Sequence, residues 1–241
     1  MNVNWEETFL NTYGTPELTL VRGHGSRVWD VTGREYIDLL GGIAVNILGA
    51  AHPNYVQAVS DQVGKLVHTS NLYINEPSVK LANKLQELVG WTGAKVFFCN
   101  SGAEANEAAL KLSRLTGKTQ VVVVEGSFHG RTMGSLSLTA QPAKQKPFEP
   151  LLNDVTVVAI NDLEALKMAI TSATAAVFLE VIQGEAGVRS LSSEFIRSAR
   201  EWTSEVGALL IIDEVQTGIG RTGGHIQKVV LLLMPSLWPK V

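Results

Sequence analysis

The chain has 241 residues, and its 20 basic and 23 acidic side chains give a net charge of −3, which argues against nucleic acid or an anionic membrane surface as a partner. With 45% hydrophobic and 18% charged residues, the composition excludes a disordered chain. The single cysteine, Cys99, excludes an internal disulfide framework and fits a reducing compartment, so we expect a cytoplasmic globular protein.

Two further patterns narrow the class of protein. The N-terminus lacks a basic segment leading into an apolar stretch, and no apolar run is long enough to span a bilayer, so neither a secretory signal nor a membrane anchor is expected. The five histidines never fall at metal-ligand spacing, so we expect no metal site.

The first part of the chain predicts small antiparallel strands within residues 22–40, because short alternating runs are joined by a turn at residues 32–34. Beyond Pro53 the pattern becomes helical, and a second helix is predicted over residues 77–88.

From residue 95 onward the pattern alternates between apolar runs typical of buried strands and amphipathic runs typical of helices. This alternation predicts an α/β fold with a parallel sheet buried on both faces. We expect Cys99 to be a core residue at the end of the first strand, and residues 141–151 to form a loop. The predicted strands are 95–99, 121–124, 155–160, 175–181 and 208–212, the helices are 105–115, 162–170 and 192–206, and the apolar stripe of the first helix is Ala105, Ala108, Ala109, Leu112 and Leu115.

In an open parallel sheet, ligands bind beyond the carboxyl ends of the strands, so the residues after each apolar run are candidates for a site. After residues 95–99, Ser101 and Glu104 have capping-box spacing, and small residues leave the N–H groups of the helix uncovered. Such a helix end can bind a phosphate, although a plain helix cap is the alternative.

Two later strand ends carry further candidates. After residues 121–124, Phe128 has the flat ring to stack on a planar ligand and Arg131 can bind a carboxylate, unless the segment is a solvated surface loop. After residues 208–212, Asp213 can pair with a cationic ring nitrogen, or it caps a loop.

Together these groups favour a pyridoxal phosphate site over a dinucleotide site. A Gly-x-Gly-x-x-Gly spacing does occur at residues 218–223, but no helical pattern follows it, so a nicotinamide cofactor is not favoured.

At these residues the sequence resembles the class III, fold type I aminotransferases, and within them the acetylornithine aminotransferases. The resemblance implies an incomplete fold type I large domain, a mostly parallel sheet flanked by helices, with a small N-terminal segment. It assigns residues 1–60 to the small domain, residues 61–223 to a partial cofactor-binding large domain and residues 224–241 to a tail outside the family. The resemblance runs from about Tyr13 to Gly223 and is carried by residues 40–46, 70–73, 75–77, 100–106, 127–132, 183–185 and 213–218.

The resemblance also implies roles for particular residues. Those for the cofactor are Ser101, Gly102 and Ala103 at the phosphate, Phe128 and Val215 on the two ring faces, Asp213 at the pyridine nitrogen and Gln216 at the phenolic oxygen. Those for the substrate are Arg131 at the α-carboxylate, Glu185 in the side-chain pocket and Tyr13 in the pocket lining.

The activity implied by the resemblance moves the amino group of N-acetylornithine to 2-oxoglutarate, a step of arginine biosynthesis. Ornithine, succinylornithine and 4-aminobutyrate aminotransferases share most of these motifs and remain alternatives. The family forms homodimers with active sites at the interface, but we expect this chain to lack much of that surface.

One family feature is missing. The resemblance implies a lysine that forms a Schiff base with the cofactor within an Ala-Lys-Gly sequence, and no lysine of this chain stands in that context. Lys240 lies near the expected distance, but no chain follows it to build a pocket, so we do not expect it to take that role.

The tail itself suggests an origin for the missing lysine. Back-translation of residues 233–241 in a shifted frame permits Asp-Ala-Phe-Thr-Val-Ala-Lys-Gly, and we hypothesise a frameshift near Gly223. We therefore expect this chain to be inactive, and a non-catalytic remnant or pseudogene product is the alternative to an enzyme. We also expect an uncovered sheet edge beyond residues 208–212.

Overall fold

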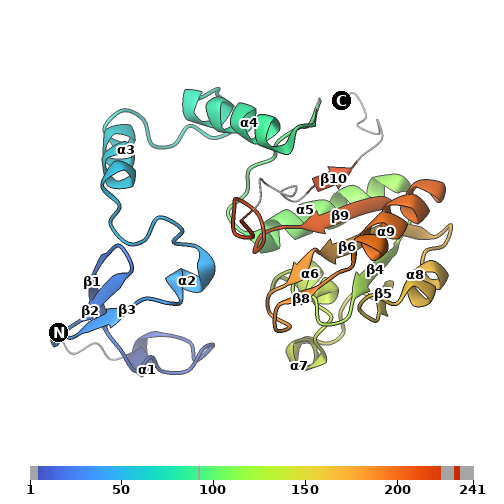
Figure 1. The fold of residues 1–241 in the computed structure, drawn as a ribbon, viewed down its shortest axis with the longest axis horizontal. Helices are drawn as coiled ribbons and strands as arrows, with labels where there is room; N and C mark the ends of the chain where they lie inside the picture. The colour runs from blue at the N-terminus through green and yellow to red at the C-terminus, as the bar shows by residue number, and fades with distance from the viewer. Residues whose placement is uncertain (1–4, 92, 224–230, 234–241) are drawn as a thin grey trace. The chain divides into compact units, whose positions relative to one another are not determined.

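The computed structural model describes residues 5–91, 93–223 and 231–233. By its internal contacts the chain divides into two compact units, Met1–Asn75 and Glu76–Val241 (Figure 1). This division falls later in the chain than the boundary expected after residue 60. The assignment of the segments to the domains of a larger fold stays a prediction.

The N-terminal unit is built around a small antiparallel sheet in the order β1-β2-β3, which confirms the strands predicted within residues 22–40. The helix predicted after Pro53 is also present, but its apolar side chains Val56, Val59 and Val63 are exposed within this unit. The elements are α1 (Trp5–Thr8), β1 (Leu20–His24), β2 (Arg27–Asp30), β3 (Glu35–Ile37), α2 (Gly41–Ala44) and α3 (Pro53–Val63).

One buried carboxylate fixes the turn between β2 and β3. Asp30 accepts hydrogen bonds from the Thr32 hydroxyl (2.6 Å) and the Tyr36 hydroxyl (2.8 Å), and from the backbone N–H groups of Thr32 and Arg34. The hydrogen bonds from Thr32 and Tyr36 lower the pKa of Asp30 to about 2. The turn that the sequence predicts at residues 32–34 is therefore held by an ionised side chain.

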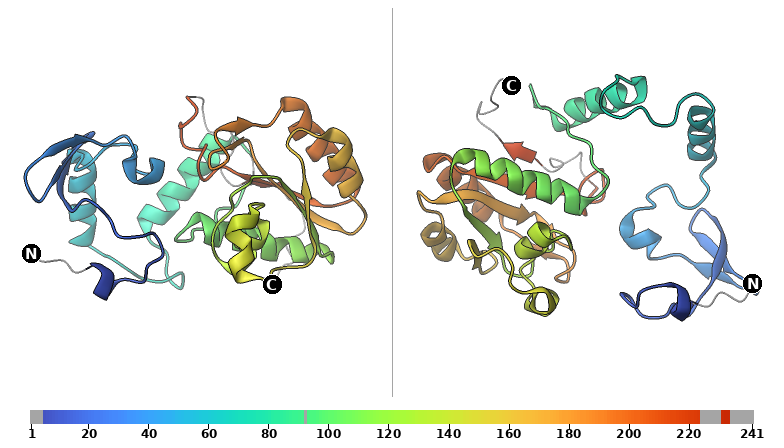
Figure 2. Two further views of the ribbon diagram at one scale, coloured as in Figure 1. Left: turned by 90° about the horizontal axis from the view of Figure 1, so that it is seen from below. Right: turned by 180° about the vertical axis from the view of Figure 1, so that it is seen from behind.

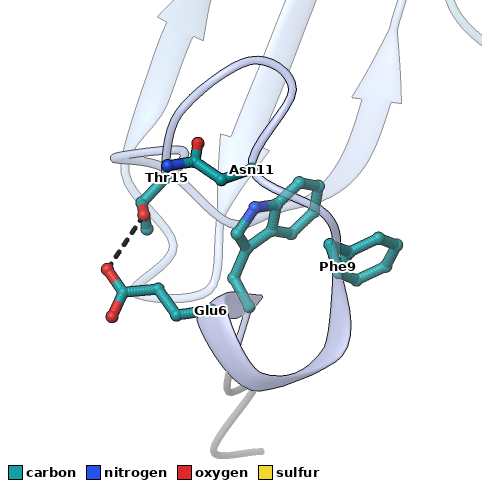
Figure 3. A pocket seen from close by; sticks show the side chains of 5 residues that line it. Glu6, Phe9, Asn11 and Thr15 are labelled. Carbon is teal, nitrogen blue, oxygen red and sulfur yellow. Dashed lines mark hydrogen bonds between the residues drawn. The ribbon is translucent and has the colours of Figure 1, made fainter.

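A pocket of about 200 Å³ opens at the start of the chain (Figure 3). The stacked rings of Trp5 and Phe9, 4.1 Å apart, line it together with Asn11, Glu6 and Thr15. The Thr15 hydroxyl donates to Glu6 over 3.0 Å. None of the lining residues was a candidate for the predicted site.

The C-terminal unit contains a five-stranded sheet in the order β10-β9-β6-β4-β5, in which β9, β6, β4 and β5 are parallel. Four of the predicted strands are thereby confirmed, as are the four predicted helices of this unit. The strands are β4 (Gln120–Val124), β5 (Val155–Val158), β6 (Thr174–Glu180), β7 (Ile182–Gln183), β8 (Arg189–Ser190), β9 (Leu209–Asp213) and β10 (Leu231–Leu233). The helices are α4 (Glu76–Val89), α5 (Gly102–Ser113), η1 (Arg114–Thr116), α6 (Met133–Leu138), α7 (Pro142–Gln145), η2 (Lys146–Phe148), α8 (Leu163–Ala169) and α9 (Ser193–Glu205).

Helices cover both faces of this sheet, and successive side chains of each strand pack into opposite layers. On one face Phe195 of α9 and Leu166 of α8 pack against Val122, Val177 and other strand residues. On the other face Leu110 of α5 and Leu138 of α6 pack against the alternate strand positions. The right-hand view of Figure 2 shows α5, in green, lying across its face. Burial on both faces explains why these strands are continuous apolar runs.

The strand predicted over residues 95–99 is absent, so this prediction is wrong. Phe97 is 70% exposed and Phe98 44% exposed, and Cys99, expected in the core, is exposed as well. Within the described residues, no strand pairs with this segment. An apolar run cannot form a strand without a neighbour to accept its backbone hydrogen bonds.

Two other expectations change, and two elements appear that were not predicted. The segment 141–151 is not a plain loop, because α7 and η2 lie within it. The short helix α6 and the β7–β8 hairpin were not predicted. The sheet edge expected to be uncovered is paired, because Leu231–Leu233 runs antiparallel to β9.

Lys240 lies outside the described residues. Among the described residues, no helix is both long and apolar enough to cross a bilayer.

The core assignment predicts a large difference between two phenylalanines. Phe195 has no exposed surface, whereas Phe148 is 54% exposed. We expect Phe195→Ala to lower the free energy of unfolding by about 3–5 kcal/mol, because it leaves a cavity between α9 and the sheet. Phe148→Ala should change it by less than about 0.5 kcal/mol. Urea denaturation followed by circular dichroism measures both, and equal losses would contradict the packing.

Candidate functional site

The candidate site lies at the end of the sheet where the strands β4, β6 and β9 all terminate in their carboxyl ends, next to the N-terminus of α5. Because these strands are parallel, the segments that follow them lie at the same edge. All of the predicted site residues except Tyr13 belong to the C-terminal unit.

The N-terminus of α5 carries the predicted cap. The Ser101 hydroxyl accepts a hydrogen bond from the Glu104 N–H over 3.1 Å, which confirms this half of the capping box. Glu104 in turn accepts from the backbone N–H of Asn100 over 2.6 Å, and its hydrogen bonds to Asn100 lower its pKa. A cap of this kind uses one N–H of the first turn and leaves those of Gly102 and Ala103 for a ligand.

Small residues are required where this helix end meets its neighbours. A Cβ atom on Gly102 would lie 2.8 Å from a methyl group of Val215. A Cβ atom on Gly130, whose φ is +133°, would lie 2.7 Å from the Cβ of Ala103. Any larger residue at either glycine would push these segments apart, so the close approach sets the shape of the site.

Asp213 is the buried carboxylate at the end of β9, with 5% of its surface exposed. Its Oδ2 accepts hydrogen bonds from Asn106 Nδ2 at 2.7 Å and from His129 Nδ1 at 2.8 Å. Its Oδ1 accepts the Val215 N–H at 3.0 Å, so the loop-cap alternative is also realised. Burial by itself raises the pKa of Asp213, but the hydrogen bond from His129 and those from Val215 and Asn106 hold it below its ordinary value. Asp213 is therefore an ionised carboxylate in a buried setting.

Phe128 is half-buried between the sheet edge and two cationic side chains. Its backbone N–H donates to Glu180 Oε1 over 2.7 Å, which ties the loop after β4 to the end of β6. The ammonium group of Lys144 lies 4.6 Å from the centre of the ring, and the guanidinium of Arg131 lies 5.8 Å from it. Arg131 itself is exposed and thus accessible to an anion.

Glu180 is a second buried carboxyl group at this edge, 6% exposed. Burial raises its pKa to about 7, against the opposing attraction of His129 and the hydrogen bond from Phe128. At neutral pH, Glu180 is therefore partly protonated beside the ionised Asp213. One negative charge rather than two is thus favoured at the base of the site.

Glu107 organises the segment that follows Arg131. Its Oε1 accepts hydrogen bonds from the Thr132 hydroxyl (2.6 Å) and from the N–H groups of Gly134 (2.8 Å) and Ser135 (3.1 Å). A carboxylate at the first turn of α6 satisfies donors that the helix itself leaves free. Glu107 therefore fixes the loop that presents Arg131.

The remaining predicted residues lie near the rim. Glu185 is exposed and forms an ion pair with Lys144, with 2.8 Å between Oε2 and Nζ. Gln216 packs against Gly184, where a Cβ atom would lie 3.1 Å from the Gln216 side chain. Tyr13 belongs to the N-terminal unit, in which its side chain is 92% exposed.

Four residues of the site were assigned no role by the sequence analysis: Asn106, Glu107, His129 and Glu180. Of the stripe predicted for residues 105–115, Ala109 is confirmed as buried, but the buried face as a whole is shifted by about one position, to Asn106, Ala109, Leu110 and Ser113. Residues 106, 109, 110 and 113 share one face of the helix, and a polar residue at the first of these positions was the available signal for Asn106. Glu180, at the end of an otherwise apolar strand, offered a similar signal. Within the part of the chain that the structure describes, no cluster of metal-binding side chains occurs.

This arrangement suits a ligand that combines a phosphate, a flat ring and a cationic ring nitrogen. The uncapped N–H groups of α5 suit the phosphate, and the ring of Phe128 suits a planar group. Asp213 is buried and ionised, so a cation is its natural partner. The residues present thus fit pyridoxal phosphate.

Comparison with known proteins agrees with this geometry. The aminotransferase class-III family matches residues 9–227, a few residues past the end of the resemblance noted in the sequence. Acetylornithine aminotransferase from Mycolicibacterium smegmatis is 58% identical over 219 residues, covering 91% of this chain and 56% of that protein. The enzyme of the same name from Streptomyces coelicolor is 57% identical, covering 91% and 54%. The chain therefore spans about half the length of these relatives.

Solved structures show the same fold. N-acetylornithine aminotransferase from Stenotrophomonas maltophilia superposes with a TM-score of 0.75 at 38% identity, covering 90% of this chain and 56% of that one. Ornithine aminotransferase from Toxoplasma gondii superposes with a TM-score of 0.84 at 30% identity, covering 92% and 54%. A second structure of the Toxoplasma enzyme, 29% identical, describes partial occupancy of PLP at its active site.

The raised pKa of Glu180 predicts a specific pH dependence of stability. Below about pH 4.5 both folded and unfolded chains hold this proton, whereas between pH 4.5 and 7 only the folded chain does. Stability therefore falls as the pH rises through this window, by up to about 3 kcal/mol. Glu180→Gln keeps an acceptor for the Phe128 N–H and removes the charge, so we expect the variant to be more stable than the parent at pH 8 and similar at pH 4.5.

Urea denaturation of the parent and the variant at both pH values checks this expectation. Glu201→Gln, at an exposed position on α9, is the matched control and should leave the pH dependence unchanged. A pH dependence of Glu180→Gln equal to that of the parent would refute the burial argument.

Proposed function

The chain belongs to the class III aminotransferases, and we propose that it forms the part of such an enzyme that binds pyridoxal phosphate and the substrate carboxylate. The reaction proposed is transfer of the amino group of N-acetylornithine to 2-oxoglutarate. The bacterial relatives named acetylornithine aminotransferase, at 57–58% identity, support this choice over the other members of the family. The lone cysteine fits a reaction in the reducing cytoplasm.

The observation that carries the proposal is the buried, ionised carboxylate of Asp213, held by Asn106 and His129 beside the N-terminus of α5. Pyridoxal phosphate, when bound, supplies an electron sink for the charge released at the Cα of an amino acid. A carboxylate that stays ionised favours a proton on the pyridine nitrogen, and this proton is what makes the ring electron-poor. Asp213 therefore has the charge that the chemistry needs.

The other cofactor residues bind and orient. Ser101 caps α5, so the N–H groups of Gly102 and Ala103 remain for the phosphate. We propose Phe128 and Val215 for the two faces of the ring, and the Gln216 side chain for the phenolic oxygen.

The proposed substrate residues are Arg131, Glu185 and Tyr13. The guanidinium of Arg131 is exposed and matches the α-carboxylate of an amino acid or a 2-oxo acid in a bidentate fork. Lys144 neutralises Glu185, so this acidic group is held at the rim rather than left as a free charge. Tyr13 is proposed for the pocket lining.

The first prediction concerns the affinity for pyridoxal phosphate. Asp213→Ala removes the partner of the ring nitrogen and should weaken binding by roughly tenfold or more, because hydrogen bonds to charged groups are strong. Titration followed by tryptophan fluorescence or by absorbance measures the dissociation constant.

Asp154→Ala is the control, since Asp154 is exposed and precedes β5, at the opposite end of the strand from the candidate site. It should bind pyridoxal phosphate like the parent chain. Equal affinities of the parent and the Asp213 variant would contradict the assigned role.

The second prediction concerns the substrate. We expect glutamate formation from 2-oxoglutarate to be at least about tenfold faster with N-acetylornithine than with ornithine or 4-aminobutyrate, since a binding site of this kind discriminates by such factors. The assay uses the chain co-expressed with the C-terminal part of a full-length relative, which supplies the Schiff-base lysine, whereas the chain alone is expected to form no glutamate.

Each outcome of this assay has a definite meaning. A preference for ornithine, succinylornithine or 4-aminobutyrate would replace the proposed substrate. Absence of glutamate in both arrangements, with cofactor binding intact, would leave the chain a binder of pyridoxal phosphate without transaminase activity.

A further inference from the structure

The two oxygens of Asp213 are held unequally. Oδ2 receives two side-chain donors, from Asn106 at 2.7 Å and His129 at 2.8 Å. Oδ1 receives one backbone donor, the N–H of Val215 at 3.0 Å. A carboxylate oxygen can accept about two hydrogen bonds, so Oδ2 is saturated and Oδ1 has one position left.

Asn106 is placed to give this asymmetry. Its side chain is buried on α5, and its Nδ2 donates both to Asp213 Oδ2 and to the backbone carbonyl of His129, at 2.9 Å. Both acceptors lack a proton to give, so the amide orientation is fixed with the NH₂ group toward them. Its Oδ1 is buried and makes no hydrogen bond among the described residues. The Asn106 side chain is thus oriented so that its NH₂ group binds Asp213, although this leaves its own Oδ1 without a hydrogen bond among the described residues.

His129 is locked in a single orientation. The ionised Asp213 can only accept, so the shared proton lies on Nδ1 of His129. The ring packs edge-on against Phe178, with 5.8 Å between centroids, and the backbone N–H donates to Thr139 Oγ1 at 2.9 Å. Nε2 is buried without a partner in the described part of the chain.

We propose that Asn106 and His129 are positioning residues that saturate Oδ2 of Asp213, so that Oδ1 alone is left to accept the N–H of a cationic pyridine ring. The inference rests on the proposed function, since it concerns how this chain recognises pyridoxal phosphate. It differs from a purely structural role of the same hydrogen bonds, because such a role would affect every ligand of the site alike.

The test compares pyridoxal phosphate with an isosteric analogue that has C–H in place of the ring nitrogen. The analogue keeps the phosphate and the flat ring, so the ratio of the two dissociation constants isolates the contact with Asp213. We expect the parent chain to prefer pyridoxal phosphate by about tenfold or more, as a charge-assisted hydrogen bond would give.

The informative variants are His129→Asn and His129→Gln, which have the same chemistry and different reach. The Asn amide nitrogen stands near the place of Nδ1 and should keep the preference. The Gln amide reaches toward the place of Nε2, away from Asp213, and should lower the preference to about threefold or less, as should Asn106→Leu. Circular dichroism and a thermal melt establish whether each variant folds. If Asn106→Leu does not fold, the comparison of His129→Asn with His129→Gln still tests the inference.

The outcomes separate the two levels of the argument. A preference equal to that of the parent chain in His129→Gln overturns the inference and leaves the proposed function standing. Equal weakening of both ligands in the variants also overturns it, since that is the signature of a structural role. Failure of the parent chain to bind pyridoxal phosphate overturns the proposed function, and the inference with it.

Discussion

A buried carboxylate without partners would neutralise itself, so the ionised state of Asp213 is the constraint on which the site depends. The side chains that meet it come from α5 and from the loop after β4, and their donors outweigh the cost of burial. Each of these elements is in turn held by the sheet. Packing of the strands therefore decides the charge of one side chain, and this charge decides which ligand the site can bind.

The parallel sheet brings these elements together. In its register, Glu180 at the end of β6 is paired with Asp213 at the end of β9. Burial is the main cause of the raised pKa of Glu180, and the negative charge of Asp213 raises it further, so Glu180 rather than Asp213 is partly protonated near neutral pH. Glu180 instead binds the backbone of Phe128, and so serves as an anchor for the aromatic side of the site.

Small residues and fixed loops complete the arrangement. Gly102 and Gly130 permit contacts that any side chain would block, and Glu107 orders the turn after Arg131. These features have little to do with stability of the core, which lies in the two apolar layers of the sheet. They determine where an aromatic ring, a guanidinium group and a helix N-terminus stand around Asp213, and thus what the site can hold.

The sequence by itself determined the four parallel strands, their helices, the Ser101 cap and the candidates at the strand ends, because periodicity and capping are local properties of the chain. It failed at residues 95–99, where an apolar run has no partner strand among the described residues, and at Asn106, which sits on the buried face of α5 one position away from the predicted stripe. Only the tertiary structure decided that Asn106, His129 and Glu180 belong to the site. Asn106 lies 107 positions before Asp213 in the chain and His129 lies 84 positions before it, and packing of the sheet brings both into contact with it. Neither these contacts nor the resulting pKa shifts can be read from spacing along the chain.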